Sequence, residues 1–349
     1  MKKFDMDATI TDIIGSGICR RSEKIQTLWS GYGEISRYIW EPKPSSSPSS
    51  TQSFIVKTIA PPANINHPRG WANEISHKRK LRSYEVEANF YRNWAQQCDT
   101  HCPVPKLLGE YGFSVATQER PPSKNTKLII MSDLDADGFS NRADTLSVKQ
   151  TKVVLSWLAH FHAKFIECDD TKEQHDLWPI GSYWHLDTRK QEFDAMPDSD
   201  LKLLAIKIDK LLNRCKYKTI IHGDAKVANF CFSRDYTRVA AVDFQYVGSG
   251  IGVKDVIYLL GSCLTENQLV NNFDTLMNEY FNFLTLAIQL YHPDLNTNNV
   301  VDEWRGLVDI AWADFERFLV GWAPSHPKRN CFSQTITNRA LAQIADNHL

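Results

Sequence analysis

The sequence predicts an α+β protein in which a small β-rich part precedes a larger, mainly helical part. Segments rich in β-branched and aromatic residues lie within the first 132 residues, at 26–40 and 52–60. Long segments with helical periodicity follow after Asp135. The chain has 349 residues, 42% of them hydrophobic and 23% charged, which is enough for one large or two medium domains with a hydrophobic core.

The β-rich part has further elements in a clear order. The run PKPSSSPSS separates the first two strand segments, and its composition predicts a mobile hairpin connection. Residues 75–97 form the one predicted helix of this part, because apolar residues recur there at three- and four-residue steps. Two more strands fit 108–116 and 127–132, joined by the turn-rich run QERPPSKNTK.

The second part is predicted to consist of long amphipathic helices around a short central motif region. The helices fall at 147–166, 200–214, 266–291 and 299–322. A linker near 131–136 divides the chain into a lobe at 1–132 and a lobe at 133–349. We expect a ligand to bind in the cleft between two such lobes.

Charge and cysteine content narrow the functional classes. The formal net charge of −1 indicates neither a basic nucleic-acid surface nor an acidic tail. No stretch approaches the roughly 18 apolar residues of a membrane span, and MKKFDMDATI lacks the apolar core of a signal peptide. We therefore expect a cytoplasmic protein whose eight cysteines are reduced thiols. Cys98, His101 and Cys102 are too few for a closed zinc site, which needs four ligands.

The run IIHGDAKVANFCF…VAAVDFQ carries the strongest chemical signal. Phosphoryl transfer from a nucleotide needs a carboxylate beside the acceptor hydroxyl and oxygen ligands for magnesium. Asp224 is the candidate catalytic base, and Asn229 and Asp243 are the candidate Mg²⁺ ligands. His222 completes the catalytic loop as a scaffold that packs beneath it.

This pattern, HGD-x4-N followed by DFQ, resembles the aminoglycoside phosphotransferase and choline kinase superfamily. The DFQ form, in place of the commoner DFE or DWE, is most similar to the ecdysteroid-kinase-like branch. The resemblance covers 26–165 and 219–262 and is thin beyond 265. It implies a two-lobed, protein-kinase-like fold with an antiparallel N-terminal sheet. It also implies ATP and Mg²⁺ as cofactors, and transfer of a phosphoryl group to a hydroxyl of a small molecule.

The resemblance assigns nucleotide-binding roles in the first lobe. Lys57, in FIVKTIA, matches the strand lysine that pairs with the α- and β-phosphates. Glu87 matches the glutamate that salt-bridges this lysine, whereas Glu85 points to the opposite helix face. Gly31 and Gly33, in SGYGEISRY, resemble the loop over the phosphates, where glycine lets the backbone approach phosphate oxygens.

The stretch LIIMSDL occupies the place of the hinge between the lobes. Backbone groups from Met131 to Asp133 are expected to pair with an adenine edge, and Ser132 stands where the family often has an acidic residue. Asp255 is predicted to cap the following helix and to brace the catalytic loop. His162 fits a family helix beside the acceptor cleft, with a core histidine as the commoner role.

The tryptophans do not identify the acceptor. The resemblance places the C-terminal region at the acceptor pocket, where aromatic rings hold a flat, apolar or cationic acceptor; core packing is the alternative. Trp304, Trp312 and Trp322 lie in that region, and Trp178 and Trp184 lie in LWPIGSYWHLD, before the helix that leads to the catalytic loop. The loop WAPSHPKRN, at 322–330, has a basic end that could contact a phosphate, which is a weak signal.

Two other classes stay open beside a small-molecule kinase. A protein kinase would share the fold, but the chain lacks HRD, DFG and an APE-like segment. A catalytically inactive nucleotide-binding scaffold is the second alternative, although the acidic and amide positions needed for metal are all present. The acceptor and the oligomeric state are not predicted.

Overall fold

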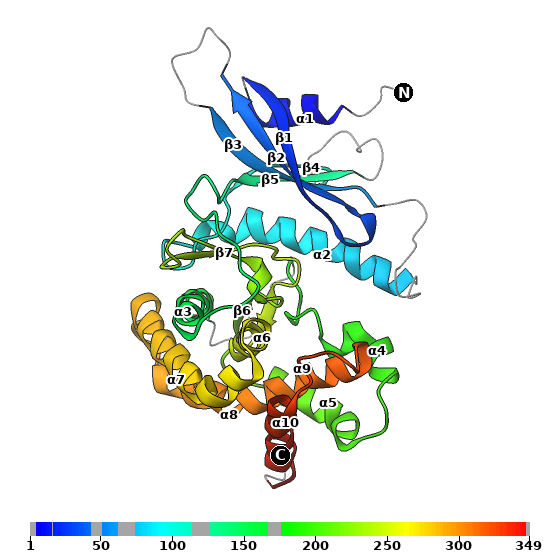
Figure 1. Cartoon of the computed structure of the whole chain (residues 1–349), viewed down its shortest axis with the longest axis vertical. Coiled ribbons are helices and arrows are strands. Elements are labelled where there is room, and N and C mark those ends of the chain that lie inside the picture. The colour runs from blue at the N-terminus through cyan, green and yellow to red at the C-terminus, as the bar shows by residue number, and fades with distance from the viewer. Residues whose placement is uncertain are drawn as a thin grey trace. The chain divides into compact units, whose positions relative to one another are not determined.

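The computed structural model describes residues 5–15, 17–42, 51–61, 74–113, 126–166 and 176–346. It separates into two compact units (Figure 1). The first comprises Met1–Gln97 and Val104–Gly138, and the second comprises Cys98–Pro103 and Phe139–Leu349. The predicted connections PKPSSSPSS and QERPPSKNTK lie almost wholly outside the described residues. The assignment of separate functions to 1–132 and 133–349 stays a prediction.

The first unit is built on a five-stranded sheet in which every neighbouring pair is antiparallel, in the order β1-β2-β3-β5-β4. The strands are β1 (Ile18–Thr27), β2 (Gly33–Glu41), β3 (Gln52–Ile59), β4 (Leu107–Tyr111) and β5 (Lys127–Ser132). The predicted α+β class with an antiparallel N-terminal sheet is therefore confirmed.

The prediction of a single helix in this unit was wrong. Besides α2 (Glu74–Asn93), a helix α1 spans Met6–Ile14. Its N-cap is Asp5, whose carboxylate accepts from the Ala8 N–H at 3.1 Å. Its sequence is short and contains several β-branched residues, so it carries little intrinsic helical signal. Packing of the fully buried Ile10 against the sheet stabilises it instead.

Strand periodicity separates the two faces of the sheet. Tyr38, Phe54 and Val56 belong to the core cluster that includes Ile10 of α1, and the Tyr38 and Phe54 rings stack at 5.7 Å. Because side chains alternate along a strand, Lys57 projects from the other face of β3. Figure 1 shows α2 running along the sheet, and the Lys57 side chain meets this helix.

The second unit is mainly helical. Its helices are α3 (Val148–Lys164), α4 (Lys190–Asp194), α5 (Asp200–Asn213), α6 (Val253–Cys263), α7 (Glu266–Tyr291), α8 (Thr297–Gly306), α9 (Val308–Trp322) and α10 (Cys331–Asp346). Its strands form two antiparallel pairs, β6 (Thr219–Ile221) with β9 (Gly248–Gly250) and β7 (Phe230–Phe232) with β8 (Val239–Ala241). Short 3-10 helices lie at Trp29–Gly31 and Ala95–Gln97 in the first unit and at Leu186–Arg189 and Val227–Asn229 here.

Most predicted helices of this unit are confirmed. Ser147 and Thr265 form capping boxes with Gln150 and Gln268, which set the starts of α3 and α7. The predicted helix at 299–322 is two helices, because the backbone of Leu307, at φ −105° and ψ 1°, leaves the helical region. Among the described residues, no helix is long and apolar enough to cross a membrane.

Candidate active site

Lys57 and Glu87 form a buried ion pair within the first unit. The Lys57 Nζ lies 2.8 and 2.6 Å from the two carboxylate oxygens of Glu87, and both side chains are almost fully buried. Glu85, two residues away, is half-exposed and pairs with Lys127 at 3.0 Å instead. The structure thus brings the predicted lysine and glutamate together. Desolvation of a buried pair offsets much of its attraction, so its main effect is to hold the ammonium in place.

Glycine is required for different structural reasons at the two predicted loop positions. Gly31 and Gly33 connect β1 to β2 and both have positive φ, +72° and +141°. A Cβ on Gly33 would lie 1.9 Å from the Thr58 carbonyl oxygen, so the pairing of β2 with β3 demands glycine there. A Cβ on Gly31 would meet no described atom within 4 Å. Gly31 is therefore the position where the turn keeps open space.

The stretch from Met131 to Asp133 is already engaged inside the first unit. Met131, in β5, pairs with strands on both sides and is nearly buried. The Ser132 N–H donates to the Lys106 carbonyl at 2.9 Å, and the Asp133 carbonyl accepts from the Asp137 N–H at 3.1 Å. Two of the backbone groups predicted to meet adenine therefore have protein partners.

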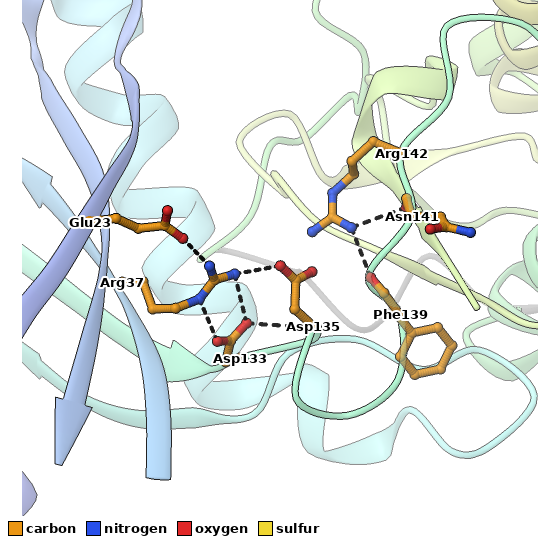
Figure 2. A network of polar contacts seen from close by, with 7 residues as sticks. All are labelled: Glu23, Arg37, Asp133, Asp135, Phe139, Asn141 and Arg142. Atoms are coloured by element: carbon orange, nitrogen blue, oxygen red, sulfur yellow. Dashed lines mark hydrogen bonds and ion pairs between the residues drawn. The ribbon is translucent and has the colours of Figure 1, made fainter. Parts of the chain in front are cut away.

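Arg37 forms a network of ion pairs with carboxylates next to this stretch (Figure 2). Arg37, on β2, donates to Asp133 at 2.6 Å and also to Asp135 and Glu23. This network ties the end of β5 to the hairpin that carries Gly33. Arg37 could not be predicted from the sequence as part of a network, because its three carboxylate partners lie 14 to 98 positions away along the chain.

The predicted catalytic loop, residues 222–229, lies in the second unit and begins directly after β6. The His222 and Gly223 N–H groups donate to the two carboxylate oxygens of Asp255, at 2.6 and 2.9 Å. Asp255 is fully buried and also contacts His162 Nε2 at 3.1 Å. Asp255 braces the loop as predicted, but it does not cap α6. Its position in the first turn leaves the N-cap to Gly252, and the carboxylate turns to the loop.

His222 lies beneath this loop and holds it to the next motif. Its fully buried ring donates from Nε2 to the Val242 carbonyl at 3.0 Å, and its Nδ1 accepts from the Asp224 N–H at 3.3 Å. The Phe244 ring packs on it at 4.6 Å. Because both ring nitrogens are used, His222 positions Asp224 and has no nitrogen left for proton transfer. His162 is likewise a buried core histidine, bonded to Tyr280 at 2.9 Å.

Asn229, Asp224 and Asp243 come together through the β7–β8 hairpin. Asn229 ends the turn before β7, and its carbonyl accepts from the Val242 N–H just after β8, at 2.9 Å. The Asn229 amide nitrogen donates to the Asp224 carbonyl at 2.8 Å and to Asp224 Oδ2 at 3.1 Å. These bonds use the amide nitrogen and leave the amide oxygen as the acceptor of this side chain.

Asp243, the other predicted Mg²⁺ ligand, has a constrained backbone conformation. Its φ of +68° is uncommon for a residue with a Cβ, and Gln245 Nε2 donates to its Oδ1 at 2.5 Å. The described residues contain no group of three or more His, Cys, Asp or Glu side chains placed to hold a metal. The amide oxygen of Asn229 and the Asp243 carboxylate suit Mg²⁺, which usually binds few protein groups together with phosphates and water.

Lys226 lies in the candidate site but was not predicted from the sequence. Its Nζ lies 3.0 Å from Asp224 Oδ2. The charge of Asp224, and then that of Asp243, holds the pKa of Lys226 above its usual range despite burial. Its position two residues after Asp224, inside the motif, was the available signal.

Two phenols lie beside Asp224. The hydroxyl groups of Tyr183 and Tyr258 are 3.4 Å apart. Burial, and then the charge of Asp224, raises the pKa of both phenols, so both remain neutral hydrogen-bond donors. Tyr246 packs edge-on to Tyr183 and stacks with Trp178, at centroid distances of 5.9 and 6.3 Å. Partly exposed rings thus continue outward from the catalytic loop.

The other tryptophans divide between core and surface. Trp184, Trp304 and Trp312 are buried. Their indole N–H groups donate to Asp314, to the Tyr217 carbonyl and to Ser333, respectively, at 2.8 to 3.0 Å. These three belong to the core, whereas Trp178 and Trp322 are partly exposed.

The ion pair in the first unit and the braced loop in the second define a kinase-like class of protein. The model of the ecdysteroid kinase-like family matches residues 33–176 and 187–293, well over half of the chain. The chain belongs to this family, which confirms the resemblance predicted from HGD-x4-N and DFQ.

Solved structures similar to this chain are distant. A choline kinase from Cryptosporidium parvum Iowa II is 9% identical, with a TM-score of 0.49, over 95% of this chain and 91% of that one. Choline kinase LicA from Streptococcus pneumoniae is 11% identical, with a TM-score of 0.40, over 98% of each chain. A microcompartment-associated aminopropanol kinase is 12% identical, with a TM-score of 0.42, over 94% of this chain and 89% of that one. The search of curated proteins found no match.

Proposed function

We propose that the protein transfers the γ-phosphoryl group of Mg-ATP to a hydroxyl of a small molecule. The observation that carries this proposal is the pair of bonds from the Asn229 amide to Asp224, which fixes a carboxylate and an oxygen ligand side by side. A base and a metal ligand in one rigid loop are the parts that phosphoryl transfer requires. Membership of the ecdysteroid kinase-like family supports the same reaction class.

The first unit is proposed to bind the nucleotide. Lys57, held by Glu87, would contact the α- and β-phosphates, because a buried ammonium fixed by a carboxylate loses no further freedom on binding. Gly31 and Gly33 would let the turn backbone approach the phosphates. The stretch from Met131 to Asp133 is proposed to meet the adenine edge with the backbone groups that are not already paired.

The second unit is proposed to hold the metal and the acceptor. The Asn229 amide oxygen and the Asp243 carboxylate would bind Mg²⁺, which supplies neutralisation of the phosphate charge. Lys226 and Asn229 both donate to Asp224 Oδ2, so Oδ1 has capacity for the acceptor hydroxyl. Asp224 would take the hydroxyl proton as the new oxygen–phosphorus bond forms and the bond to the β-phosphate oxygen breaks. Positioning and charge neutralisation would supply most of the rate gain.

The test is ATP consumption across a library of hydroxyl compounds, run on wild type and on Asp224→Asn. The library would include aminoglycosides, choline, ethanolamine, sugars, homoserine and sterols. Asp198→Asn is the matched control, because Asp198 is fully exposed and lies outside the motifs. We expect turnover with at least one acceptor, lost in Asp224→Asn and kept in Asp198→Asn.

Calorimetry of ATP binding with and without Mg²⁺ separates the alternatives. Magnesium-dependent ATP binding without turnover of any acceptor would favour the inactive scaffold. Phosphorylation of peptides without turnover of small molecules would favour a protein kinase. An Asp224→Asn enzyme with wild-type turnover would refute the role of Asp224.

A further inference from the structure

The segment between α9 and α10 brings a lysine to the aromatic rings beside the catalytic loop. Lys328 Nζ lies 5.0 Å from the centroid of the Tyr258 ring and 5.8 Å from that of Phe315. Tyr258 is the buried phenol whose pKa responds to the charge of Asp224. All four residues belong to the second unit. The ammonium of Lys328 therefore lies in the neighbourhood of the proposed catalytic base.

The segment that carries Lys328 is held by buried polar contacts. The next residue, Arg329, donates from Nε to Glu316 Oε1 at 2.8 Å and also bonds the Pro324 carbonyl. Glu316 is buried, and its second oxygen accepts from Ser333 at 2.9 Å. Charge-assisted bonds to a buried carboxylate are strong and directional. The position of Lys328 is thus set by the fold and is not that of a free surface side chain.

The ammonium of Lys328 lacks an oxygen partner within the described part of the chain. Its described interactions are with the two rings, and no described carboxylate, carbonyl or hydroxyl bonds to it. Burial lowers the pKa of Lys328 to about 8, while the charge of Asp224 acts in the opposite direction. A partly buried ammonium without a hydrogen-bond acceptor is costly. An acceptor oxygen on a ligand would satisfy it.

The charges around the loop argue against a cationic acceptor. Two carboxylates, Asp224 and Asp243, are matched by two ammonium groups, Lys226 and Lys328. The electrostatic influence of Asp224 reaches both lysines, and Lys226 also acts on Lys328. Aromatic faces recognise quaternary ammonium groups, but Lys328 already occupies those of Tyr258 and Phe315. A cationic acceptor would compete with it for these faces.

A cavity of about 350 Å³ adjoins this lysine. Lys328 and Phe315 line it, together with Leu264, Leu269 and Trp312. Another lining residue, Ser262, accepts from the Val227 N–H of the catalytic loop at 2.9 Å. Its volume is at the small end of ligand pockets.

We propose that Lys328 selects a small acceptor that carries an anionic group, a carboxylate or a phosphate, in addition to the reacting hydroxyl. The anionic group binds the Lys328 ammonium while the hydroxyl meets Asp224. This assignment of substrate class rests on the proposed phosphotransferase function.

The test measures binding to matched compounds that differ in charge. One series is D-glycerate, sn-glycerol 3-phosphate, glycerol and 3-amino-1,2-propanediol, and the other is pantothenate and its neutral alcohol panthenol. Calorimetry with the Mg-ADP complex gives affinities for wild type, Lys328→Met and Lys328→Arg. Lys216→Met is the matched control, because Lys216 also lies over a ring, that of Tyr217 at 5.2 Å.

We expect an anionic member to bind about ten- to a hundredfold more tightly than its neutral partner, the range of one charge-assisted bond. Lys328→Met should remove this preference, and Lys328→Arg and Lys216→Met should keep it, with Mg-ADP affinity unchanged throughout. The glycerate and glycerol phosphate arms tell which anion is recognised.

Three outcomes would overturn the proposal: no preference for any anionic member, tightest binding of the cationic member, or an effect of Lys328→Met on Mg-ADP alone. The last would assign the lysine to the nucleotide phosphates. Failure of the proposed function has a different signature, which is the absence of ATP-dependent turnover of every acceptor, whether or not Mg-ATP binds. Binding of the anionic probes to the nucleotide-free protein would still report on Lys328.

Discussion

The side-chain amide of Asn229 bonds both the carbonyl and the carboxylate of Asp224, at 2.8 and 3.1 Å. This double contact orients the amide, so that its nitrogen serves the proposed base and its oxygen is left for a cation. The β7–β8 hairpin places Asp243 next to it through the bond from the Val242 N–H to the Asn229 carbonyl. In the proposed mechanism, proton acceptance and metal binding would therefore be coupled through Asn229.

Asn229→Ala should impair both activities at once. Loss of the amide oxygen should raise the Mg²⁺ concentration needed for half-maximal activity, and loss of the donor should free Asp224 from its fixed rotamer. We expect kcat to fall about 10²-fold or more, the weight of a positioned general base.

Asp243→Asn should remove only the metal contribution and abolish the magnesium dependence of ATP binding. Magnesium titrations of activity and of ATP binding check both; equal Mg²⁺ requirements for Asn229→Ala and wild type would contradict the assignment.

The loop and the Lys57–Glu87 pair were predictable because their signals are local. The spacing within HGD-x4-N is a property of one turn. The resemblance to the family assigned Lys57 and Glu87, and helix periodicity separated Glu87 from Glu85. The roles of these residues stay predictions, whereas their proximity is a structural fact.

Other features could not be predicted because they depend on contacts between distant segments. Arg37 meets Asp133 across 96 positions, and Lys328 reaches Tyr258 from beyond α9. Helix α1 has low intrinsic helix propensity, and packing of Ile10 on the sheet, together with Met6, Ile13 and Ile14 at helical spacing, stabilises it. The pairing of the Asp133 carbonyl with the Asp137 N–H is likewise a result of the folded turn.

Variants of the Lys57–Glu87 pair should distinguish an effect on stability from an effect on nucleotide binding. Removing one partner leaves a buried charge unpaired, so Lys57→Met or Glu87→Gln should lower the free energy of unfolding by about 3–5 kcal/mol. The double variant Lys57→Met/Glu87→Met should recover most of this loss, because a well-packed apolar pair is often as stable as the ion pair. Its affinity for ATP should nevertheless remain low.

Urea unfolding and ATP calorimetry on the three variants measure the two effects separately. Glu85→Gln is the control, since Glu85 is half-exposed and exposed pairs contribute about 0–1 kcal/mol. If ATP affinity returned together with stability in the double variant, the ammonium would have no role in binding the nucleotide.

Asp255→Asn should loosen the catalytic loop without touching the reacting groups. The amide can accept with one oxygen only, so one of the two N–H donors from His222 and Gly223 loses its partner. An unsatisfied buried donor costs about 1–3 kcal/mol. We expect a loss of that size in unfolding free energy and a larger fall in kcat than in ATP affinity. Unchanged kcat in a destabilised Asp255→Asn enzyme would show that the brace does not position Asp224.

The titration of Lys328 should appear in the binding of an anionic acceptor. Burial lowers its pKa to about 8, so the ammonium is charged below this pH and is progressively lost above it. Affinity for D-glycerate, whose carboxylate stays ionised, should therefore fall above about pH 8 and approach a tenfold loss per pH unit. Because the unfolded chain retains that proton up to about pH 10.4, the same shift makes this group's contribution to folding stability increase as pH rises from about 8.

Titration of neighbouring groups does not explain a loss of affinity above about pH 8. Asp224 and Lys226 face Lys328 as charges, and the pKa of Lys226 lies above its usual range, so it stays protonated. Burial raises the pKa of the Cys263 thiol to about 12, and the Tyr258 phenol is shifted upward as well. His326, Arg329 and Glu266 lie in the same region, and Lys328→Met keeps all three. Calorimetry from pH 6.5 to 10 should give an affinity for D-glycerate that does not change with pH in Lys328→Met. Lys328→Arg should keep its affinity to the top of this range. If the wild-type decline persists in Lys328→Met, the titration belongs to another group.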